Sequence, residues 1–446
     1  MSVGKWKVRS KLRSARLGPV MRLALAVIGL SACRPGSPLR EEALAAWMQS
    51  LAAAGDSLGL ADLALQQCEP VQGTERQRCY ETFFVALSDS GRVRLALGTL
   101  GGLARADHQV EGDGHLYTHL IGIKAWRPGR DVGATFASCT GLFQSGCYHG
   151  VIQAYLTAEG DADSSRVASL CDAIEGPTGD KWLRFQCVHG VGHGLEMIWN
   201  WDLPRALAGC DWLPTAWDRE GCYGGAFMEN AVASIPGGHH AVAEVIAEAH
   251  QDHGTRESHD LSPAFRMRDS ADALYPCSAV GDRYQSSCYM LQGGIILQRV
   301  GMDFARAAAE CDRAPARVRH NCYLSLGTSA SGITVRNARQ AIGYCSHGDP
   351  GYQPWCFVGV VKNFIDVTAR PEDGLAFCTL VPEGRNRRQC WVAVGEQLRV
   401  LHATDESSRA LGCARAPAEG REACRFGAGL LAVPPPGLPI RPGEAP

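Results

Sequence analysis

The sequence lacks an excess of charge of either sign. Its 446 residues include 44 lysines and arginines against 46 aspartates and glutamates, and the formal net charge is -2. A protein that binds nucleic acid usually carries a strongly basic surface. The near balance of charge therefore gives no reason to expect a nucleic-acid partner.

The sequence also lacks the short motifs of several enzyme classes. It contains no glycine-rich phosphate loop, no dinucleotide-binding glycine fingerprint, no His-Glu-x-x-His zinc motif and no convincing serine or cysteine nucleophile. A Cys-x-x-Cys-His sequence is absent as well, which excludes covalent haem attachment of the c-type. Whether the protein is an enzyme stays open at this point.

Long hydrophobic runs are scarce, and the one nearest the N-terminus covers only residues 23–30. That run is too short to cross a bilayer, and it follows a stretch rich in lysine and arginine. A basic segment followed by a short apolar one is typical of a secretory signal. We therefore expect residues 1–32 to be a signal peptide, with translation starting at Met1 or at Met21.

The signal ends in Leu30-Ser31-Ala32-Cys33, which resembles the lipobox of bacterial lipoproteins. The resemblance implies cleavage before Cys33 and lipid on its sulfur and new amino terminus. The chain would then be exported and held on a membrane by this anchor, facing the periplasm or the cell surface. The alternative is an ordinary export signal that leaves Cys33 as a free thiol.

Cysteine is abundant, with 19 residues in the chain. Such a set would stay reduced in a cytosol, so it indicates an oxidising compartment. Many of the cysteines are spaced 34 residues apart, and Asp113 stands midway between two others at the same spacing. A period of this size is typical of stacked two-helix units, because one hairpin cannot bury its apolar face alone. The positions on this spacing are Cys288, Cys322, Cys356, Cys390 and Cys424, and, nearer the N-terminus, Cys79, Asp113 and Cys147.

Each repeat is expected to hold an apolar first helix that starts at the spaced position, a turn, and an alanine-rich second helix. Asp or Asn before the second helix suits an N-cap, and the second helix usually ends in another cysteine. The pattern predicts an all-α protein, a right-handed α-solenoid of about ten 34-residue helix-turn-helix repeats. First helices are expected at Cys79, Asp113, Cys147, Cys187, Cys222, Cys288, Cys322, Cys356, Cys390 and Cys424.

This architecture resembles helical-hairpin solenoids such as tetratricopeptide arrays and their disulfide-stapled, secreted relatives. The resemblance extends from Cys68 to about Val433 and concerns architecture alone, because the tetratricopeptide consensus is absent. It therefore implies no function.

Two disulfide schemes fit a helical hairpin: each hairpin closes on itself, or each second helix is tied to the first helix of the next repeat. Asp113 replaces a cysteine, and the helix expected just before it, around residues 95–106, also lacks one. This paired loss favours the second scheme, whose short loops each contribute roughly 2–3 kcal/mol. The expected disulfides are Cys68–Cys79, Cys139–Cys147, Cys171–Cys187, Cys210–Cys222, Cys277–Cys288, Cys311–Cys322, Cys345–Cys356, Cys378–Cys390 and Cys413–Cys424.

The spacing also predicts the domain organisation. An insertion of about 32 residues separates Cys222 from Cys288 and contains a predicted helix at residues 241–250; it is either a lid or a surface loop. The expected segments are a linker at 33–55, N-terminal helical repeats at 56–230, the inserted His-containing segment at 231–270, C-terminal helical repeats at 271–433 and a disordered Pro-rich tail at 434–446.

Histidine is enriched at two positions of three successive repeats. Counted from Asp113, Cys147 and Cys187, the second and sixth residues that follow are histidine in five of six cases, although the chain has only 14 histidines. Residues four apart share one helix face, and first helices of adjacent repeats lie side by side. We therefore expect these side chains to converge. The six positions hold His115, His119, His149, Gln153, His189 and His193.

Imidazole-rich sites suit zinc, copper or iron better than magnesium or calcium. Glycines within the same predicted helices, such as Gly190 and Gly192, allow a neighbouring backbone or a flat ligand to approach closely. The expected site is a transition-metal ion held by the five histidines, and haem is possible. The candidates for supporting the ligands are Gln153, Glu196 and Glu229.

The sequence is compatible with three functions. The first is metal binding for handling, redox chemistry or hydrolysis by a metal-bound water. The second is an envelope scaffold whose concave face binds a protein or peptide, with the histidines as polar packing between helices. The third is a haem protein. The insertion contains five further histidines, which we expect to be either solvated loop residues or part of a lid over the site. They are His239, His240, His250, His253 and His259.

Overall fold

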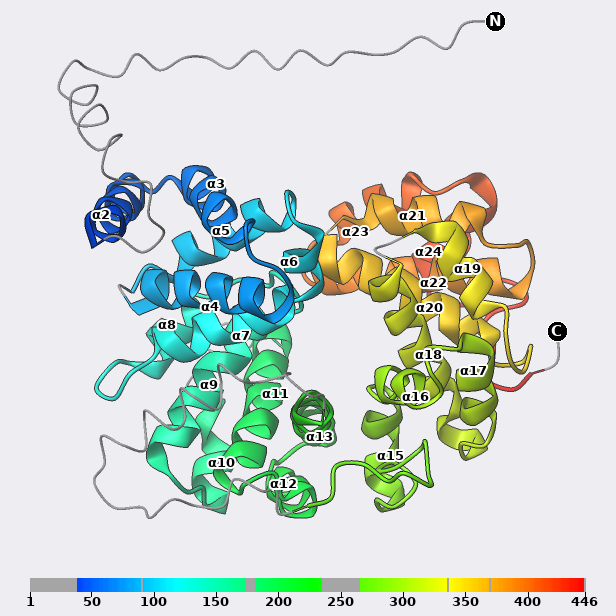
Figure 1. The fold of residues 1–446 in the computed structure, drawn as a ribbon. Helices are drawn as coiled ribbons and strands as arrows, with labels where there is room; N and C mark the ends of the chain where they lie inside the picture. Colours follow the sequence, from blue (N-terminus) through cyan, green and yellow to red (C-terminus); the bar gives the residue numbers. More distant parts are fainter. Residues whose placement is uncertain are drawn as a thin grey trace, which may run out of the picture. The chain divides into compact units, whose positions relative to one another are not determined.

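The structure is a computed structural model that describes residues 38–89, 91–172, 181–234, 265–334, 337–368 and 370–444. These residues form helices joined by turns and contain no strand, which confirms the all-α class (Figure 1). None of the helices formed by these residues is long and apolar enough to cross a membrane. The predicted helix at 241–250, the histidines of the insertion and Cys33 lie outside the described residues.

The chain divides into two compact units, residues 1–56 and 57–446. The described part of the first unit is helix α2 (Pro38–Ala54). This helix occupies most of the segment 33–55 that we predicted to be a linker. Its composition explains the difference, because alanine, leucine and glutamate favour a helix and Pro38 suits its first turn.

In the second unit, long and short helices alternate from α7 to α13 and from α18 to α23. Up to residue 233 the helices of this unit are α3 (Ser57–Cys68), α4 (Gly73–Asp89), α5 (Val93–Ala104), α6 (His108–Gly112), α7 (Gly114–Ala125), α8 (Val132–Ala137), α9 (Gly146–Glu159), α10 (Ser164–Leu170), α11 (Lys181–Ile198), α12 (Leu203–Cys210) and α13 (Ala216–Ala233). After residue 264 they are α15 (Asp282–Tyr289), α16 (Gly293–Arg299), α17 (Phe304–Asp312), α18 (Ala316–Ile333), α19 (Ala338–Cys345), α20 (Gln353–Thr368), α21 (Pro371–Leu380), α22 (Arg385–Leu401), α23 (Glu406–Ala414) and α24 (Ala418–Gly427).

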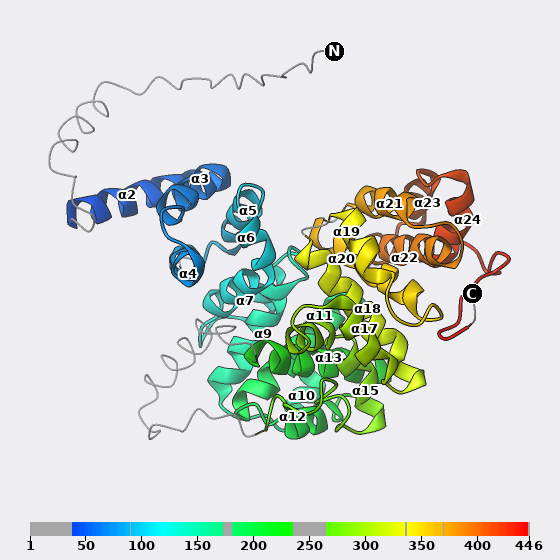
Figure 2. The ribbon, with the colours of Figure 1, turned by 45° about the vertical axis from the view of Figure 1, so that its right-hand side comes forward.

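Successive long helices pack on one another within two parts of the chain. The contacts run from α7 to α9, α11 and α13, and again from α18 to α20, α22 and α24 (Figures 1 and 2). Short helices contact the next short helix in the same way, as α17, α19 and α21 do. The helical-repeat character of the chain is therefore present, while the right-handed path and the count of about ten repeats stay predictions.

The long helices begin earlier than we predicted. Cys187 and Cys322 lie in the second turn of α11 and α18, which start at Lys181 and Ala316. The short helices begin where expected, because Asp or Asn side chains accept main-chain N–H groups at their starts. These caps are Asp131, Asp163, Asp202, Asp303, Asn337 and Asp405.

The described residues contain nine disulfides, and each joins two cysteines across a junction between repeats. Their Cα–Cα distances are 5.4–5.8 Å, which is ordinary disulfide geometry. These are the nine pairs expected from the sequence, in which each second helix is tied to the first helix of the next repeat. Nine disulfides are consistent with an exported protein.

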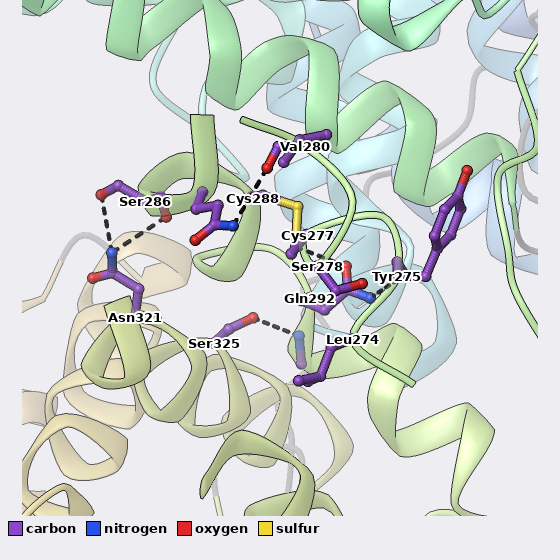
Figure 3. The surroundings of a disulfide bond; sticks show 12 residues. Leu274, Tyr275, Cys277, Ser278, Val280, Ser286, Cys288, Gln292, Asn321 and Ser325 are labelled. Atoms are coloured by element: carbon purple, nitrogen blue, oxygen red, sulfur yellow. Dashed lines mark hydrogen bonds between the residues drawn. A yellow bond between two sulfur atoms is a disulfide. The ribbon is translucent and has the colours of Figure 1, made fainter. Parts of the chain in front are cut away.

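The helix expected to continue from Cys288 is instead divided into α15 and α16 (Figure 3). At the break, the Gln292 amide donates a 2.7 Å hydrogen bond to the Tyr275 carbonyl. Gly293 follows, and its main-chain N–H donates to the Ser325 hydroxyl over 2.8 Å. A β-carbon on Gly293 would lie 2.6 Å from the Ser325 main chain, so α18 packs directly against this break.

The Pro-rich tail, predicted to be disordered, is held against the helices as far as residue 444. The Gly443 N–H donates a 3.1 Å hydrogen bond to the Gly351 carbonyl, and Ile440 is buried. Prolines prevented us from predicting a packed segment here, yet a chain without helix or strand can still bury an apolar side chain.

Candidate metal centre

The five histidines come from three consecutive long helices. His115 and His119 lie one turn apart on α7, His149 lies on α9, and His189 and His193 lie one turn apart on α11. Four of them are 2–6% exposed, and His115 is half-buried. The structure therefore brings together all five residues that the sequence analysis singled out.

Glycines set the short distance between these helices. A β-carbon on Gly150 of α9 would lie 2.2 Å from the His119 carbonyl of α7, and one on Gly122 of α7 would lie 2.1 Å from the Cys147 carbonyl. Such distances are impossible for a real side chain, so the two backbones touch because both residues are glycine. The same reciprocal contact joins α11 to α13, where a β-carbon on Gly225 would lie 1.9 Å from the His189 carbonyl.

These glycine contacts correct the register assigned to α7. In α9 and α13 the reciprocal glycine follows the cysteine by three residues, and in α11 Gly192 follows Cys187 by five. Gly122 is the α7 equivalent of Gly192, which makes Tyr117, and not Asp113, the counterpart of the cysteine. His119, His149 and His189 therefore occupy equivalent positions on their helices, and His115 lies one turn earlier than the spacing had suggested.

His149 lies at the centre of the cluster. Its ring centroid is 5.8 Å from that of His115 and 5.3 Å from that of His119. It is 4.5 Å from that of His189 and 5.5 Å from that of His193. The ring centroids of His119 and His193 are also close, at 4.7 Å from each other. His149 thus contacts all four of the other rings.

The nitrogens form two overlapping sets of three. His115, His119 and His149 each have a ligand nitrogen within 4.8 Å of the others, and so do His149, His189 and His193. We call these the outer triad and the inner triad. Among the described residues no other group of three histidines, cysteines or carboxylates meets this criterion.

Four of the five rings have one nitrogen bonded to an oxygen outside the cluster. The Nδ1 of His115 lies 2.8 Å from the Phe143 carbonyl, and the Nδ1 of His193 lies 2.9 Å from the Glu229 carboxylate. The Nδ1 of His119 is 3.4 Å from the Gln153 side-chain oxygen, and the Nε2 of His149 is 2.9 Å from that of Gln186. Because these oxygens accept, each of these nitrogens carries the proton, and the other nitrogen of the ring holds a lone pair.

The lone pairs belong to nitrogens inside the cluster. Nδ1 of His149, Nε2 of His193 and both nitrogens of His189 are buried and have no hydrogen-bond partner. Nε2 of His115 and Nε2 of His119 lie 3.1 Å apart. Two lone pairs at that distance repel each other unless a proton or a metal ion lies with them. Buried polar atoms without partners are rare and call for an explanation.

Burial also keeps the central rings neutral. It lowers the pKa of His149 well below its ordinary value, and the neighbouring His189 and His193 lower it further. Burial and the rings of His193 and His115 lower the pKa of His189 in the same way. The nearby Gly221 main chain makes no well-formed hydrogen bond with the ring and offsets this only in part. Neutral imidazole is the form that binds a metal ion.

The predicted supporting residues take different roles. Gln153 contacts His119 and also donates to Glu229 over 3.3 Å. Glu229 contacts His193 and accepts a 3.3 Å hydrogen bond from the Trp201 indole. Glu196 is fully buried, neither of its oxygens has a hydrogen-bond partner, and burial beside Glu229 and Asp202 raises its pKa well above the ordinary value.

Three supporting groups were not predicted from the sequence: Gln186, the Trp201 indole and the Phe143 carbonyl. Gln186 directly precedes Cys187, so its place in the repeat was available as a signal. Phe143 begins three successive residues, up to Ser145, with positive φ angles of 46°, 56° and 66°. That conformation is costly for residues other than glycine, and here it directs a main-chain carbonyl at His115.

Comparison of the chain with models of known protein families, with curated proteins and with solved structures gives no match, so the function of this centre is inferred from its own residues.

Proposed function

We propose that this protein binds a transition-metal ion through His115, His119, His149, His189 and His193. One observation carries the proposal: four rings are anchored to oxygens by one nitrogen, while the other nitrogen is turned into a buried cluster. Anchoring of this kind orients ligand histidines at metal sites and sets their tautomers. Polar packing alone does not explain why Nδ1 of His149 and Nε2 of His193 are buried without hydrogen-bond partners.

The chemistry of the donors favours zinc, copper or iron. All the candidate ligand atoms are imidazole nitrogens, and the 18 cysteines in disulfides cannot act as thiolate ligands. The Glu229 carboxylate bonded to His193 makes that ring a stronger ligand and supplies negative charge close to a bound cation.

The burial of the ligands favours holding or transfer of the ion over hydrolysis of a substrate. A catalytic metal keeps a coordination position open to substrate, whereas four of the five rings are at most 6% exposed. Haem fits less well, because ring centroids only 4.5–5.8 Å apart leave no room for a porphyrin between them.

The proposal includes export and a lipid anchor at Cys33, so that the centre would act at a membrane surface outside the cytoplasm. The lipobox-like sequence and the nine disulfides support this placement. Mass measurement of the mature N-terminus would test it. A lipid-modified Cys33 is expected, and an unmodified cysteine or an uncleaved leader would contradict it.

Metal binding is tested by dialysing separate samples of the purified mature protein against zinc, copper or iron and then measuring bound metal. The wild type should retain zinc in the presence of a competing chelator, and His189→Ala with His193→Ala should weaken binding at least 100-fold. His347→Ala is the matched control, because His347 is exposed and outside the cluster. A wild type that retains no zinc, copper or iron would overturn the proposal.

A further inference from the structure

We infer that the outer and inner triads are two alternative positions for one metal ion, which enters at the outer triad and is held at the inner one. This rests on the proposed metal-binding function and adds the number of ions and their route. The outer triad is His115, His119 and His149, and the inner triad is His149, His189 and His193.

The shared ligand limits the number of ions. His149 belongs to both triads, but its Nε2 donates to the Gln186 oxygen over 2.9 Å. Only Nδ1 remains, and one lone pair serves one ion. Two ions bound together would leave one of the triads with two ligands.

Charge also limits the number of ions that the cluster binds at one time. An imidazole that binds a metal ion is an uncharged ligand, so a bound dication is balanced only by carboxylates nearby. A second dication in the same buried cluster would add two positive charges without a further counter-charge among the ligands. One ion at a time is the state that the described charges can balance.

A carboxylate that is bonded to a histidine lies on the side of the inner triad. This is Glu229, which lies 2.9 Å from the Nδ1 of His193. The outer triad is anchored by neutral oxygens, those of Phe143 and Gln153. A cation is therefore held more strongly at the inner triad than at the outer one.

Access lies on the side of the outer triad. His115 is half-buried, whereas His149, His189 and His193 are 3%, 6% and 2% exposed. An ion from solvent meets His115 first. Because His149 touches rings of both triads, the ion can exchange one pair of ligands for the other without leaving the protein.

The inference predicts different effects for the two ends of the cluster. At saturation the wild type should bind one Co²⁺ per chain. His115→Ala should slow Co²⁺ uptake at least tenfold, while it weakens binding far less than the inner variant does. His189→Ala should keep rapid uptake but weaken binding at least 100-fold.

Stopped-flow absorbance with Co²⁺, joined to equilibrium titration of the same full-length mature proteins, separates the outcomes. His108→Ala, an exposed histidine on α6, is the control for uptake, and helical content by circular dichroism verifies folding. His115→Gln repeats the test with a side chain closer in size. Two Co²⁺ per wild-type chain, or equal weakening of binding by the outer and inner variants, would overturn the inference. A wild type that binds neither Co²⁺ nor zinc, copper or iron would instead overturn the proposed function itself.

Discussion

The carboxylate of Glu229 lies 2.9 Å from the Nδ1 of His193, and both side chains are almost completely buried. The two residues come from neighbouring helices, α13 and α11, whose backbones touch at glycines. This contact assigns the proton of His193 to Nδ1 and leaves Nε2 for an ion. The packing of α13 on α11 therefore places a negative charge beside His193 and orients the ring as a ligand.

We predict that Glu229→Gln weakens metal binding by about 10–100-fold, because the ligand loses an anionic partner while the shape of the site is kept. Chelator competition measures the change. Glu220→Gln serves as the control, since Glu220 lies on the same helix but bonds to Ser287 instead of a histidine. Equal affinities for the wild type and Glu229→Gln would contradict a role for this contact.

Gly225→Ala should destabilise the protein and weaken metal binding together. The new methyl group would lie 1.9 Å from the His189 carbonyl and force α11 and α13 apart, a change that costs about 1–3 kcal/mol or more. Urea unfolding and metal titration measure the two effects.

Two other glycines provide the comparison. Gly427→Ala has the same clash, at 2.0 Å from the Val392 carbonyl, but on helices without the histidines, so it should destabilise without changing metal affinity. Gly343→Ala meets nothing within 4 Å inside α19 and should stabilise by about 0.5–1 kcal/mol. A tolerated Gly225→Ala would show that the helices need not touch.

Removal of one disulfide distant from the histidine helices should affect stability alone. Replacing Cys311 and Cys322 by serine opens a loop whose ends are 11 residues apart. The chain-entropy model gives a loss of about 3 kcal/mol for such a loop. Unfolding in urea should report this loss, with bound metal unchanged. Loss of the metal in this variant would mean that the two halves of the chain are coupled.

The metal-free protein should lose stability as the pH falls below about 6.5. The folded state holds the pKa of His149 and His189 well below the ordinary value, so it keeps both rings neutral. The unfolded chain protonates them below pH 6.5 and therefore binds more protons, which favours unfolding. Between pH 7.5 and 5.5 these two rings should cost roughly 2–3 kcal/mol in the free energy of unfolding.

The comparison uses His149→Gln with His189→Gln, which cannot take up these protons. The wild type should lose roughly 2–3 kcal/mol more than this variant over the same pH interval, measured by urea unfolding without metal. Parallel pH profiles for the two proteins would show that the rings are not held neutral in the folded state.

The spacing of cysteines and histidines was sufficient to predict the class of the fold and the members of the cluster. The positions of Cys79, Asp113 and Cys147 indicated which helices follow one another, because the period of a repeat is a property of the sequence. The same spacing wrongly made His115 the equivalent of His149, although it lies one helical turn before that position. The register of α7 against α9 is set by the contact of Gly122 with the Cys147 main chain, which the spacing of cysteines does not show.

The partners of the histidines were less accessible to prediction. Gln186 reaches His149 from the next helix, and the Phe143 carbonyl reaches His115 from a strained turn. Both contacts depend on how helices and turns are placed in space. A main-chain carbonyl has no residue type that could mark it in a sequence, so the anchoring of His115 required the structure.

The most direct test of a histidine metal centre is X-ray absorption spectroscopy of the metal-loaded protein. The account predicts nitrogen ligands at about 2.0–2.1 Å with the outer-shell scattering of several imidazoles, and no sulfur ligand near 2.3 Å. His189→Ala with His193→Ala should reduce the imidazole contribution. A first shell of oxygen alone, or one that contains sulfur, would contradict the assignment of the five histidines as the metal centre.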